Sequence, residues 1–394
     1  MSGVIPAGAE AALEEPFLVD VLGTLVRTRS VNPGVFEVAM AERVRAWLAD
    51  LPVEVAVVEF AEGRPSVAAV LGDPAGPRLV LNGHMDTVPV DDLGEWDSDP
   101  FEPSVRDGWL YGRGACDMKA GLAVQIAVAH HLAALGGQLR GALVLHFASG
   151  EECGEPGTLS LLQRGFTGNV GIVTEPTRLN VSVATRGLGH YRIALRGRSI
   201  HASQAHLGVN PVGALRAVLE AVAGHDAEAR ARSHPLLPGG SLTPTVVNGG
   251  VKVNAVADSC ELLLDRRLLP GEAVDDDMSA LRARLAAVTE VVPGLEVDLE
   301  TIHTPFEPAE IDVASPFADR VARTVREVSG RPGDIVGTPY ASDVRNLVND
   351  AGIEAVTFGP GNVAECHCAN ERVSLAEVRD GAAVIAHLAR EIVL

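Results

Sequence analysis

The sequence predicts an α/β fold, with a mostly parallel mixed sheet flanked by helices and a smaller α+β domain inserted into it. Three observations support this prediction. The chain has 394 residues, 47% of them hydrophobic, and is long enough for two domains. Short apolar runs alternate with helical patterns in its first half and again near its end. Between these parts, the pattern changes to strands in which apolar and polar residues alternate.

Three short apolar runs in the first half are typical of buried strands of a parallel sheet. They cover residues 78–82, 142–147 and 171–173. An Ala-rich stretch over residues 119–135 lies between the first two runs. It predicts a helix that stops at Gly136 and Gly137, since glycine commonly ends helices.

The inserted domain is predicted from the change of pattern near residue 187. Residues 191–196, and in part residues 261–266, alternate as strands with one solvated face do. A helical pattern covers residues 211–222, and a loop rich in Pro, Gly and Ser surrounds residues 235–241.

The α/β pattern then returns and continues to the end of the chain. Helices are expected at 315–329, near 344–351 and at 374–390, with a strand at 355–358. We therefore predict a discontinuous domain made of residues 1–186 and 301–394, and an inserted domain of residues 187–300.

Charge and composition exclude several classes of protein. The net charge of −20 repels phosphate backbones, which argues against nucleic acid as a partner. No uncharged apolar run reaches the ~18 residues of a membrane span, so no membrane association is expected. Residues 1–20 lack the pattern of a secretory signal. The five cysteines have no framework spacing and favour reduced thiols, so we expect a cytoplasmic protein.

Polar clusters follow the three predicted strands. His84 and Asp86 follow the first, Glu151 and Glu152 the second, and Glu175 the third. Taken singly, these are explained by a buried histidine or a solvated acidic loop, and Asp117 by a helix N-cap. Because ligands bind at the carboxyl edge of open α/β sheets, their joint occurrence there predicts one shared crevice.

The chemistry of this crevice points to metal ions. The candidate donors are two imidazoles and three carboxylates: His84, Asp117, Glu152, Glu175 and His367. So many carboxylates cannot all ionise side by side without counter-charge. Two divalent ions would supply it, with zinc the best match for these ligands and cobalt or manganese possible. A metal pair polarises a carbonyl group and activates water near neutral pH.

Two further acidic residues have predicted roles beside the donors. Asp86, two residues after His84, is placed to hold the second nitrogen of that imidazole. Glu151 precedes Glu152, would point differently from it, and can act as general base for the water. Other enzyme classes have no support, since the chain lacks both G-x-S-x-G and H-E-x-x-H, and no G-x-G-x-x-G is complete.

The ordered motifs resemble those of the dinuclear zinc amidohydrolases. That family includes acetylornithine deacetylase, succinyl-diaminopimelate desuccinylase, aminoacylase and glutamate carboxypeptidase. The matching segments cover residues 83–89, 111–121, 149–152, 174–176 and 359–361, followed by His367. The resemblance therefore extends over nearly the whole chain.

This resemblance implies a role for each candidate residue of the metal centre. Asp117 would bridge two zinc ions and precede a cis peptide bond. Glu151 would act as the base. His84 and Glu175 would bind one zinc ion, and Glu152 and His367 would bind the other.

The resemblance also implies that the inserted domain is a lid that usually dimerises. His201, in the segment of residues 197–203, would reach the active site of the partner subunit and stabilise the oxyanion. A structural interface histidine is the alternative. Asn254 and Arg267 resemble lid residues that contact substrate, and Arg345 resembles a carboxylate clamp. For these three, a surface ion pair is the competing interpretation.

Two features depart from the family pattern. Ala369 stands where relatives usually have Pro. Cys116, Cys153, Cys366 and Cys368 each lie beside a proposed site residue. We interpret them as small buried hydrophobic residues, with sensitivity to oxidation or thiophilic metals as the weaker hypothesis.

These observations predict metal-dependent hydrolysis of an amide bond in a small N-acyl amino acid that carries a free carboxylate. Such an enzyme would resemble acetylornithine deacetylase or succinyl-diaminopimelate desuccinylase and act as a homodimer through its inserted domain. A metallo-carboxypeptidase or dipeptidase is the first alternative, and a non-catalytic, metal-free binding protein is the second.

Overall fold

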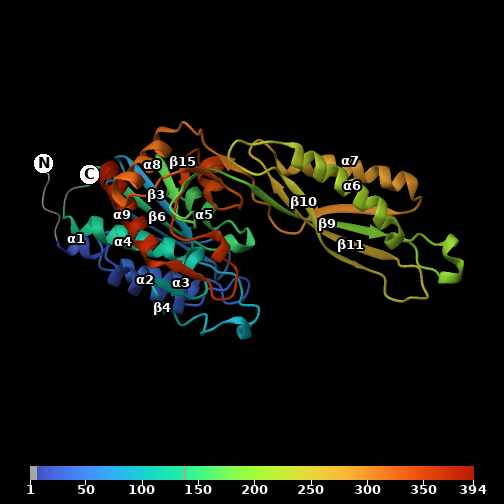
Figure 1. Cartoon of the computed structure of the whole chain (residues 1–394), viewed down its shortest axis with the longest axis horizontal. Coiled ribbons are helices and arrows are strands. Elements are labelled where there is room, and N and C mark those ends of the chain that lie inside the picture. The colour runs from blue at the N-terminus through green and yellow to red at the C-terminus, as the bar shows by residue number, and fades with distance from the viewer. Residues whose placement is uncertain (1–6, 137–138) are drawn as a thin grey trace. The chain divides into compact units, whose positions relative to one another are not determined.

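The computed structural model describes residues 7–136 and 139–394 and divides the chain into two compact units (Figure 1). Residues 1–6 of the predicted first domain, and Gly137 of the predicted helix stop, lie outside the described residues. The first unit contains the residues up to Val183, Glu310–Val336 and Ser342–Leu394. The second contains Ala184–Ala309 and Gly337–Ala341.

The second unit extends past the predicted boundary at residue 301. The chain beyond this point still pairs with the start of the unit, because Leu188 and Phe306 exchange backbone hydrogen bonds of 2.8 Å in both directions. The short segment Gly337–Ala341 belongs to the same unit, and the backbone N–H of Arg186 donates to the carbonyl of Thr338 at 3.3 Å.

A nine-stranded sheet forms the centre of the first unit. Its strands are β1 (Glu54–Glu59), β2 (Pro65–Gly72), β3 (Arg78–His84), β6 (Ala142–Ala148), β7 (Val170–Val173), β8 (Val181–Thr185), β13 (Ala309–Glu310), β14 (Ile335–Thr338) and β15 (Glu354–Thr357). Their order is β1-β2-β6-β3-β7-β15-β8-β13, and β14 pairs with β8. The four central strands β6, β3, β7 and β15 are parallel, which confirms the predicted fold class.

The register of the central strands brings their carboxyl ends to one edge. The strands β3 and β6 pair in parallel up to His84 and Ala148, and Asn82 of β3 pairs with Val173 at the end of β7. Every residue of β6 is buried, as its uninterrupted apolar run predicts. The segments that leave these three strands therefore start side by side.

Helices pack around this sheet. They are α1 (Ala7–Ala11), α2 (Glu15–Arg27), α3 (Val38–Leu48), α4 (Ala120–Ala134), α5 (Gly157–Gln163), α8 (Pro316–Ser329) and α9 (Leu375–Val393). The short turns are η1 (Leu93–Glu95), η2 (Ala115–Lys119), η3 (Glu151–Cys153), η5 (Asn346–Asp350) and η6 (Val363–Glu365). A small sheet of β4 (Ser104–Arg106), β5 (Trp109–Tyr111) and β16 (Arg372–Ser374) has the order β16-β5-β4.

Helix α4 confirms the predicted apolar helix. It is buried on nearly all sides because it contacts α2, α9 and the strands β3 and β6 (Figure 1). It ends before Gly136, whose φ of 66° suits glycine. The expected helix near residues 344–351 is present over residues 344–350, and most of it is the short π-helical turn η5.

The second unit packs two helices on an antiparallel sheet. Its elements are β9 (Gly187–Arg196), η4 (Ala202–Leu207), α6 (Pro211–Ala231), β10 (Ser241–Gly249), β11 (Ser259–Leu268), α7 (Val274–Val291) and β12 (Glu296–Thr301). The strand order is β10-β11-β9-β12, so β10 is an edge strand. Helix α6 runs past the predicted end at residue 222.

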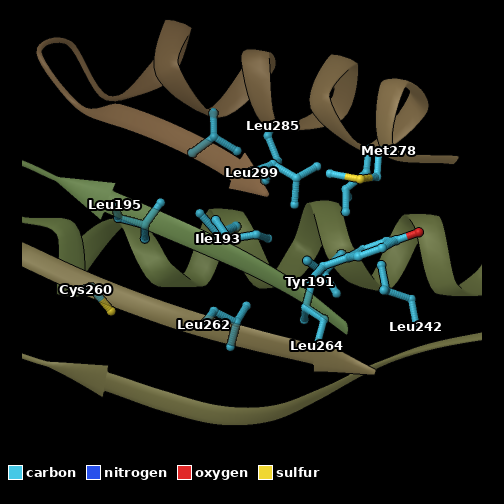
Figure 2. Packing of buried hydrophobic residues seen from close by; sticks show 14 of the residues in the cluster. Tyr191, Ile193, Leu195, Leu242, Cys260, Leu262, Leu264, Met278, Leu285 and Leu299 are labelled. Carbon is cyan, nitrogen blue, oxygen red and sulfur yellow. The ribbon is translucent and has the colours of Figure 1, made fainter. Parts of the chain in front are cut away.

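Alternating side chains of β9 and β11 form the core of the second unit. Tyr191, Ile193 and Leu195 of β9 lie beside Leu262 and Leu264 of β11 (Figure 2), in a cluster that also contains residues of α6 and α7. This is the alternation seen in the sequence, and the intervening polar residues are less buried.

No helix in the described part of the chain is both long and apolar enough to cross a membrane.

Candidate metal centre

Five potential metal donors converge at the carboxyl edge of the central sheet. His84 is the last residue of β3, and Glu152 lies on the turn η3 after β6. Glu175 follows β7, and His367 lies in the segment after β15. Asp117 lies in η2, directly before α4. The first unit thus brings together all five donors expected from the sequence.

The carboxylate of Asp117 lies between the two imidazoles. Its Oδ1 is 3.1 Å from His84 Nε2, and its Oδ2 is 3.2 Å from His367 Nε2. Glu175 Oε1 is 3.4 Å from His84 Nε2, and Glu152 Oε2 is 3.3 Å from His367 Nε2. Each imidazole nitrogen therefore faces two carboxylates, one of which is shared.

The donor set fits two divalent cations. Burial, reinforced by the charge of Asp117, raises the pKa of Glu175 to about 7 and also raises the pKa of Glu152. Glu152 Oε1 is buried and has no hydrogen-bond partner among the described residues. Hydrogen bonds with Asp117 and Glu152 raise the pKa of His367 to about 11. Metal ions would supply the positive charge that these carboxylates otherwise draw from imidazolium groups.

Glu151 lies on the same turn as Glu152 and is 8% exposed. Burial raises its pKa well above the usual value, and the negative charges of Asp343, Glu175 and Glu152 act in the same direction, against His84. A carboxylate with a raised pKa is suited to accept a proton and pass it on near neutral pH.

Asp86 touches His84 mainly through its backbone. His84 Nδ1 is 3.0 Å from the carbonyl oxygen of Asp86 and 3.5 Å from its carboxylate Oδ1. The carboxylate accepts hydrogen bonds from the backbone N–H groups of Gly150, Glu151 and Glu152 at 3.0, 3.2 and 3.1 Å. The predicted orienting role thus falls largely to the carbonyl, while the carboxylate holds the turn.

Glu371 was not identified from the sequence, although it binds the segment that carries Asp117. Its Oε1 accepts from the backbone N–H groups of Cys116 and Asp117 at 2.9 and 3.0 Å. Its Oε2 accepts from Gly114 N–H at 2.9 Å and from Arg113 Nη1 at 2.7 Å. The peptide bond between Asp117 and Met118 is cis, as expected. Glu371 could have been identified from the sequence because it lies in the same segment as His367, shortly after it.

A second network that was not identified lies behind the turn η3. Asn32 Nδ2 donates to Asp86 Oδ2 at 2.9 Å and to Glu155 Oε2 at 3.3 Å. Arg64 Nη1 donates to Glu155 Oε1 at 2.7 Å, and Arg64 also binds Glu37 through two bonds of 2.8 Å. These residues lie far apart in the sequence, and no local pattern connects them.

Arg345, the predicted carboxylate clamp, is 8% exposed in the first unit. Its Nη1 lies 3.6 Å from Asp343 Oδ1. Asp343 Oδ2 in turn accepts from Thr158 Oγ1 at 2.6 Å. Arg345 therefore lies beside an acidic residue, as the ion-pair alternative expects, but this pair is buried and not on the surface.

The other three predicted residues lie in the second unit. His201 is exposed, and its Nδ1 is 2.8 Å from Ser203 Oγ. The carbonyl of Asn254 accepts from the backbone N–H of Ala202 at 3.0 Å, so Asn254 and His201 lie on adjoining segments. Arg267 forms an ion pair with Asp265 at 2.9 Å, which is the contact named as its alternative.

The cysteines differ in exposure. Cys116 is buried and its Sγ lies 3.5 Å from Cys366 Sγ, whereas Cys153 and Cys366 are partly buried. Cys368 is exposed, so the interpretation as a small buried residue is wrong for this thiol. Its neighbour His367 is half exposed in the same segment, which explains the difference.

A family model and several known proteins match most of the chain. The family model described as Peptidase family M20/M25/M40 matches residues 80–391. A succinyl-diaminopimelate desuccinylase from Nitrosomonas europaea is 31% identical over 313 residues, 77% of this chain and 80% of that protein. An acetylornithine deacetylase from Vibrio parahaemolyticus is 29% identical over 379 residues, 92% and 95% of the two chains. A deformylase of N-formyl-4-amino-5-aminomethyl-2-methylpyrimidine from Halalkalibacterium halodurans is 26% identical over 390 residues, 92% and 91%.

Solved structures share the fold at lower identity. Aminopeptidase PepT from Bacillus cereus superposes with a TM-score of 0.79 at 20% identity, covering 97% of this chain and 99% of that one. A Bacillus subtilis protein described as a dinuclear metal binding peptidase has a TM-score of 0.69 at 17% identity, with 96% and 98% covered.

Proposed function

Because the chain belongs to peptidase family M20/M25/M40 and is a hydrolase of amide bonds, we propose that it removes the acyl group from an N-acyl amino acid bearing a free carboxylate. The observation that carries this proposal is the geometry around Asp117, whose two oxygens face His84 and His367. Relatives that match most of the chain include an acetylornithine deacetylase and a succinyl-diaminopimelate desuccinylase.

The proposed metal ligands are the five converging donors. Asp117 would bridge two ions, with His84 and Glu175 on one side and Glu152 and His367 on the other. The ions, zinc in our proposal with cobalt or manganese as alternatives, would polarise the amide carbonyl and make water acidic.

The proton transfers fall to Glu151. It would take a proton from the attacking water and pass it to the nitrogen of the leaving amine. Asp86 supports this role because its carboxylate binds the backbone N–H of Glu151 itself. Arg345, Arg267 and Asn254 are proposed to hold the substrate and its carboxylate, for which guanidinium groups are suited.

A homodimer formed through the second unit would complete the site. The strand β10 lies at the edge of its sheet, next to β11, and exposes Val246 and Val247 at 44% and 54%. We propose that this strand meets its copy, and that His201 of the partner subunit stabilises the oxyanion formed by attack on the amide.

A substrate panel tests the proposed reaction. Acetyl-, succinyl- and formyl-amino acids would be compared with dipeptides and with peptides that have a free C-terminal carboxylate, using protein loaded with zinc or cobalt. We expect turnover of N-acyl amino acids in preference to peptides. Preferential release of C-terminal residues would instead favour the carboxypeptidase alternative, and no turnover by metal-loaded protein would contradict the proposal.

The variant Glu151→Gln tests the proposed base. We expect kcat to fall by about 10²–10⁴-fold, the usual contribution of a general acid or base. Bound metal, measured by elemental analysis, should remain at the wild-type level because Glu151 is not among the proposed ligands. Loss of metal together with activity would show that the residue is a ligand.

A further inference from the structure

A cavity in the second unit is lined by two arginines and a glycine-rich loop. Its volume is about 330 Å³, and its walls are Arg186, Arg230 and residues 238–241. Arg186 lies between β8 and β9, Arg230 is in the last turn of α6, and the loop leads into β10. All of these residues belong to the same compact unit.

The loop lies close to the end of α6 and to the side chain of Arg266, where glycine avoids short contacts. A Cβ atom on Gly240 would lie 2.9 Å from Arg266 Nη1, and one on Gly239 would lie 2.9 Å from the carbonyl oxygen of Arg230. Both distances are shorter than side-chain carbons accept. The loop backbone therefore lies close to Arg266 and to the carbonyl of Arg230, and its two glycines add no side chain to the cavity wall.

Arg186 differs from its neighbours because it forms no ion pair with any of the described residues. Arg230 forms an ion pair with Asp226 at 2.7 Å, Arg267 with Asp265 at 2.9 Å, and Arg266 with Asp277 at 2.6 Å. Within the described residues, the side-chain hydrogen bond of Arg186 is long: its Nη2 donates to Ser241 Oγ at 3.4 Å.

Two further observations describe the same imbalance. Arg186 Nε is buried and has no hydrogen-bond partner among the described residues. Burial, together with the charges of Arg267, Arg266 and Arg230, lowers the pKa of Arg186, and the charge of Asp265 offsets only part of this effect. A partly buried guanidinium that faces other cations and has a buried N–H without an acceptor is unfavourable unless an anion occupies the space beside it.

We propose that this cavity binds a small oxyanion, a carboxylate or a phosphate, with Arg186 as its principal ligand. A guanidinium group binds both kinds of anion through paired N–H donors. The anion would accept hydrogen bonds from Arg186 and Arg230. This inference does not rest on the proposed hydrolysis, because binding is measurable without turnover.

The test compares the metal-loaded protein with the variants Arg186→Gln and Arg216→Gln. Arg216 is the matched control, since it lies on α6, is 87% exposed and pairs with Glu220 outside the cavity. Melting temperature and calorimetric binding would be measured with sodium phosphate and sodium succinate, against sodium chloride at equal ionic strength. Binding at the metal centre is common to all three proteins and cancels in the comparison.

We expect phosphate or succinate to raise the melting temperature of the wild type and of Arg216→Gln, and to bind Arg186→Gln at least tenfold more weakly. In chloride alone, Arg186→Gln should melt no lower than the wild type, because it removes an unbalanced charge. Equal anion binding by Arg186→Gln and the wild type would overturn the proposal. A lower melting point of that variant in chloride would also overturn it, since Arg186 would then be structural.

Inhibition kinetics distinguish the two sources of the anion. If the bound anion competes with an N-acyl amino acid, and Arg186→Gln raises KM without changing kcat, the cavity receives the carboxylate of the substrate. If the anion changes the rate at saturating substrate, and Arg186→Gln abolishes this change, the cavity receives a separate small anion. Both results support the site.

Discussion

At the scale of single residues, Asp86 and Glu371 each bind a segment that carries metal donors, although neither belongs to the five donors. Asp86 accepts the backbone N–H groups of the turn that carries Glu152, and Glu371 accepts those around Asp117. A buried carboxylate that receives several backbone N–H groups fixes the position of a whole loop. The precision of the proposed metal centre therefore depends on acids outside it.

Asp86→Ala should destabilise the protein and lower its metal content. The substitution leaves the backbone N–H groups of Gly150, Glu151 and Glu152 without an acceptor, and each orphaned group costs about 1–3 kcal/mol. We expect a loss of at least about 3 kcal/mol in urea unfolding. The control is Asp92→Ala, because Asp92 accepts one backbone N–H, from Gly94, at an exposed site. Equal stability of the two variants would contradict this role for Asp86.

Glu175 predicts a specific pH dependence for the metal-free protein. Burial and the charge of Asp117 raise its pKa from 4.5 to about 7, so the folded protein holds this proton more tightly than the unfolded chain does. The resulting stability is fully present below pH 4.5 and is lost as pH rises through about 7. Between about pH 5 and about pH 6.5 the loss is about 2 kcal/mol.

Urea unfolding of chelated protein at these two pH values measures this effect. Glu175→Gln should reduce the fall in stability by about 2 kcal/mol relative to the wild type. His367, whose pKa is raised to about 11, contributes its own loss only above its usual 6.5, outside this window. An unchanged pH dependence in the variant would show that Glu175 is not the group responsible.

At the scale of secondary-structure elements, the site is predictable where donors follow strands with a clear apolar pattern. The runs of β3, β6 and β7 are visible in the sequence, so His84, Glu152 and Glu175 could be placed at one edge. Asp117 and His367 were included in the donor set for their chemistry, because no strand precedes them directly, and only the family resemblance gave them distinct roles. Asn32 and Arg64 could not be found, because a buried polar contact between distant segments leaves no periodic signal.

The elements differ from the prediction in two places. Residues 344–350 are helical, as expected near 344–351, but most of this helix is the π-helical turn η5, with buried Asn346 bonded to Asp350 at 2.8 Å. The second unit continues to Ala309, beyond the predicted end at residue 300, because Ile302 bonds to His190 and Phe306 bonds to Leu188 through the backbone.

Arg64 joins three elements and should be costly to remove. It precedes β2, binds Glu37 at the start of α3, and binds Glu155 after η3. Arg64→Met leaves the fully buried Glu37 without its partner, which typically costs about 3–5 kcal/mol. The double variant Arg64→Met/Glu37→Leu should recover part of this loss in a urea-unfolding cycle. If the double variant recovers no stability, the contribution of Arg64 comes from its contact with Glu155, which also binds Asn32, and not from Glu37.

At the scale of the whole molecule, β1 and β10, each at the edge of a different sheet, offer a direct test of assembly. Both expose valines, Val57 at 46% and Val247 at 54%. In our proposal, only β10 meets its copy in a dimer.

Val247→Lys should therefore shift the protein to monomers in light scattering and lower its kcat, because His201 would no longer reach the partner. Val57→Lys places the same charge on the other edge and should leave both properties unchanged. A dimer that persists in Val247→Lys would exclude β10 as the contact.

The hydrogen bond from the backbone N–H of Ala202 to the carbonyl of Asn254 ties two distant segments of the chain together. An insertion or deletion in either segment would break this bond and displace both His201 and Asn254. Side-chain substitutions leave the bond in place, because both of its partners are backbone groups.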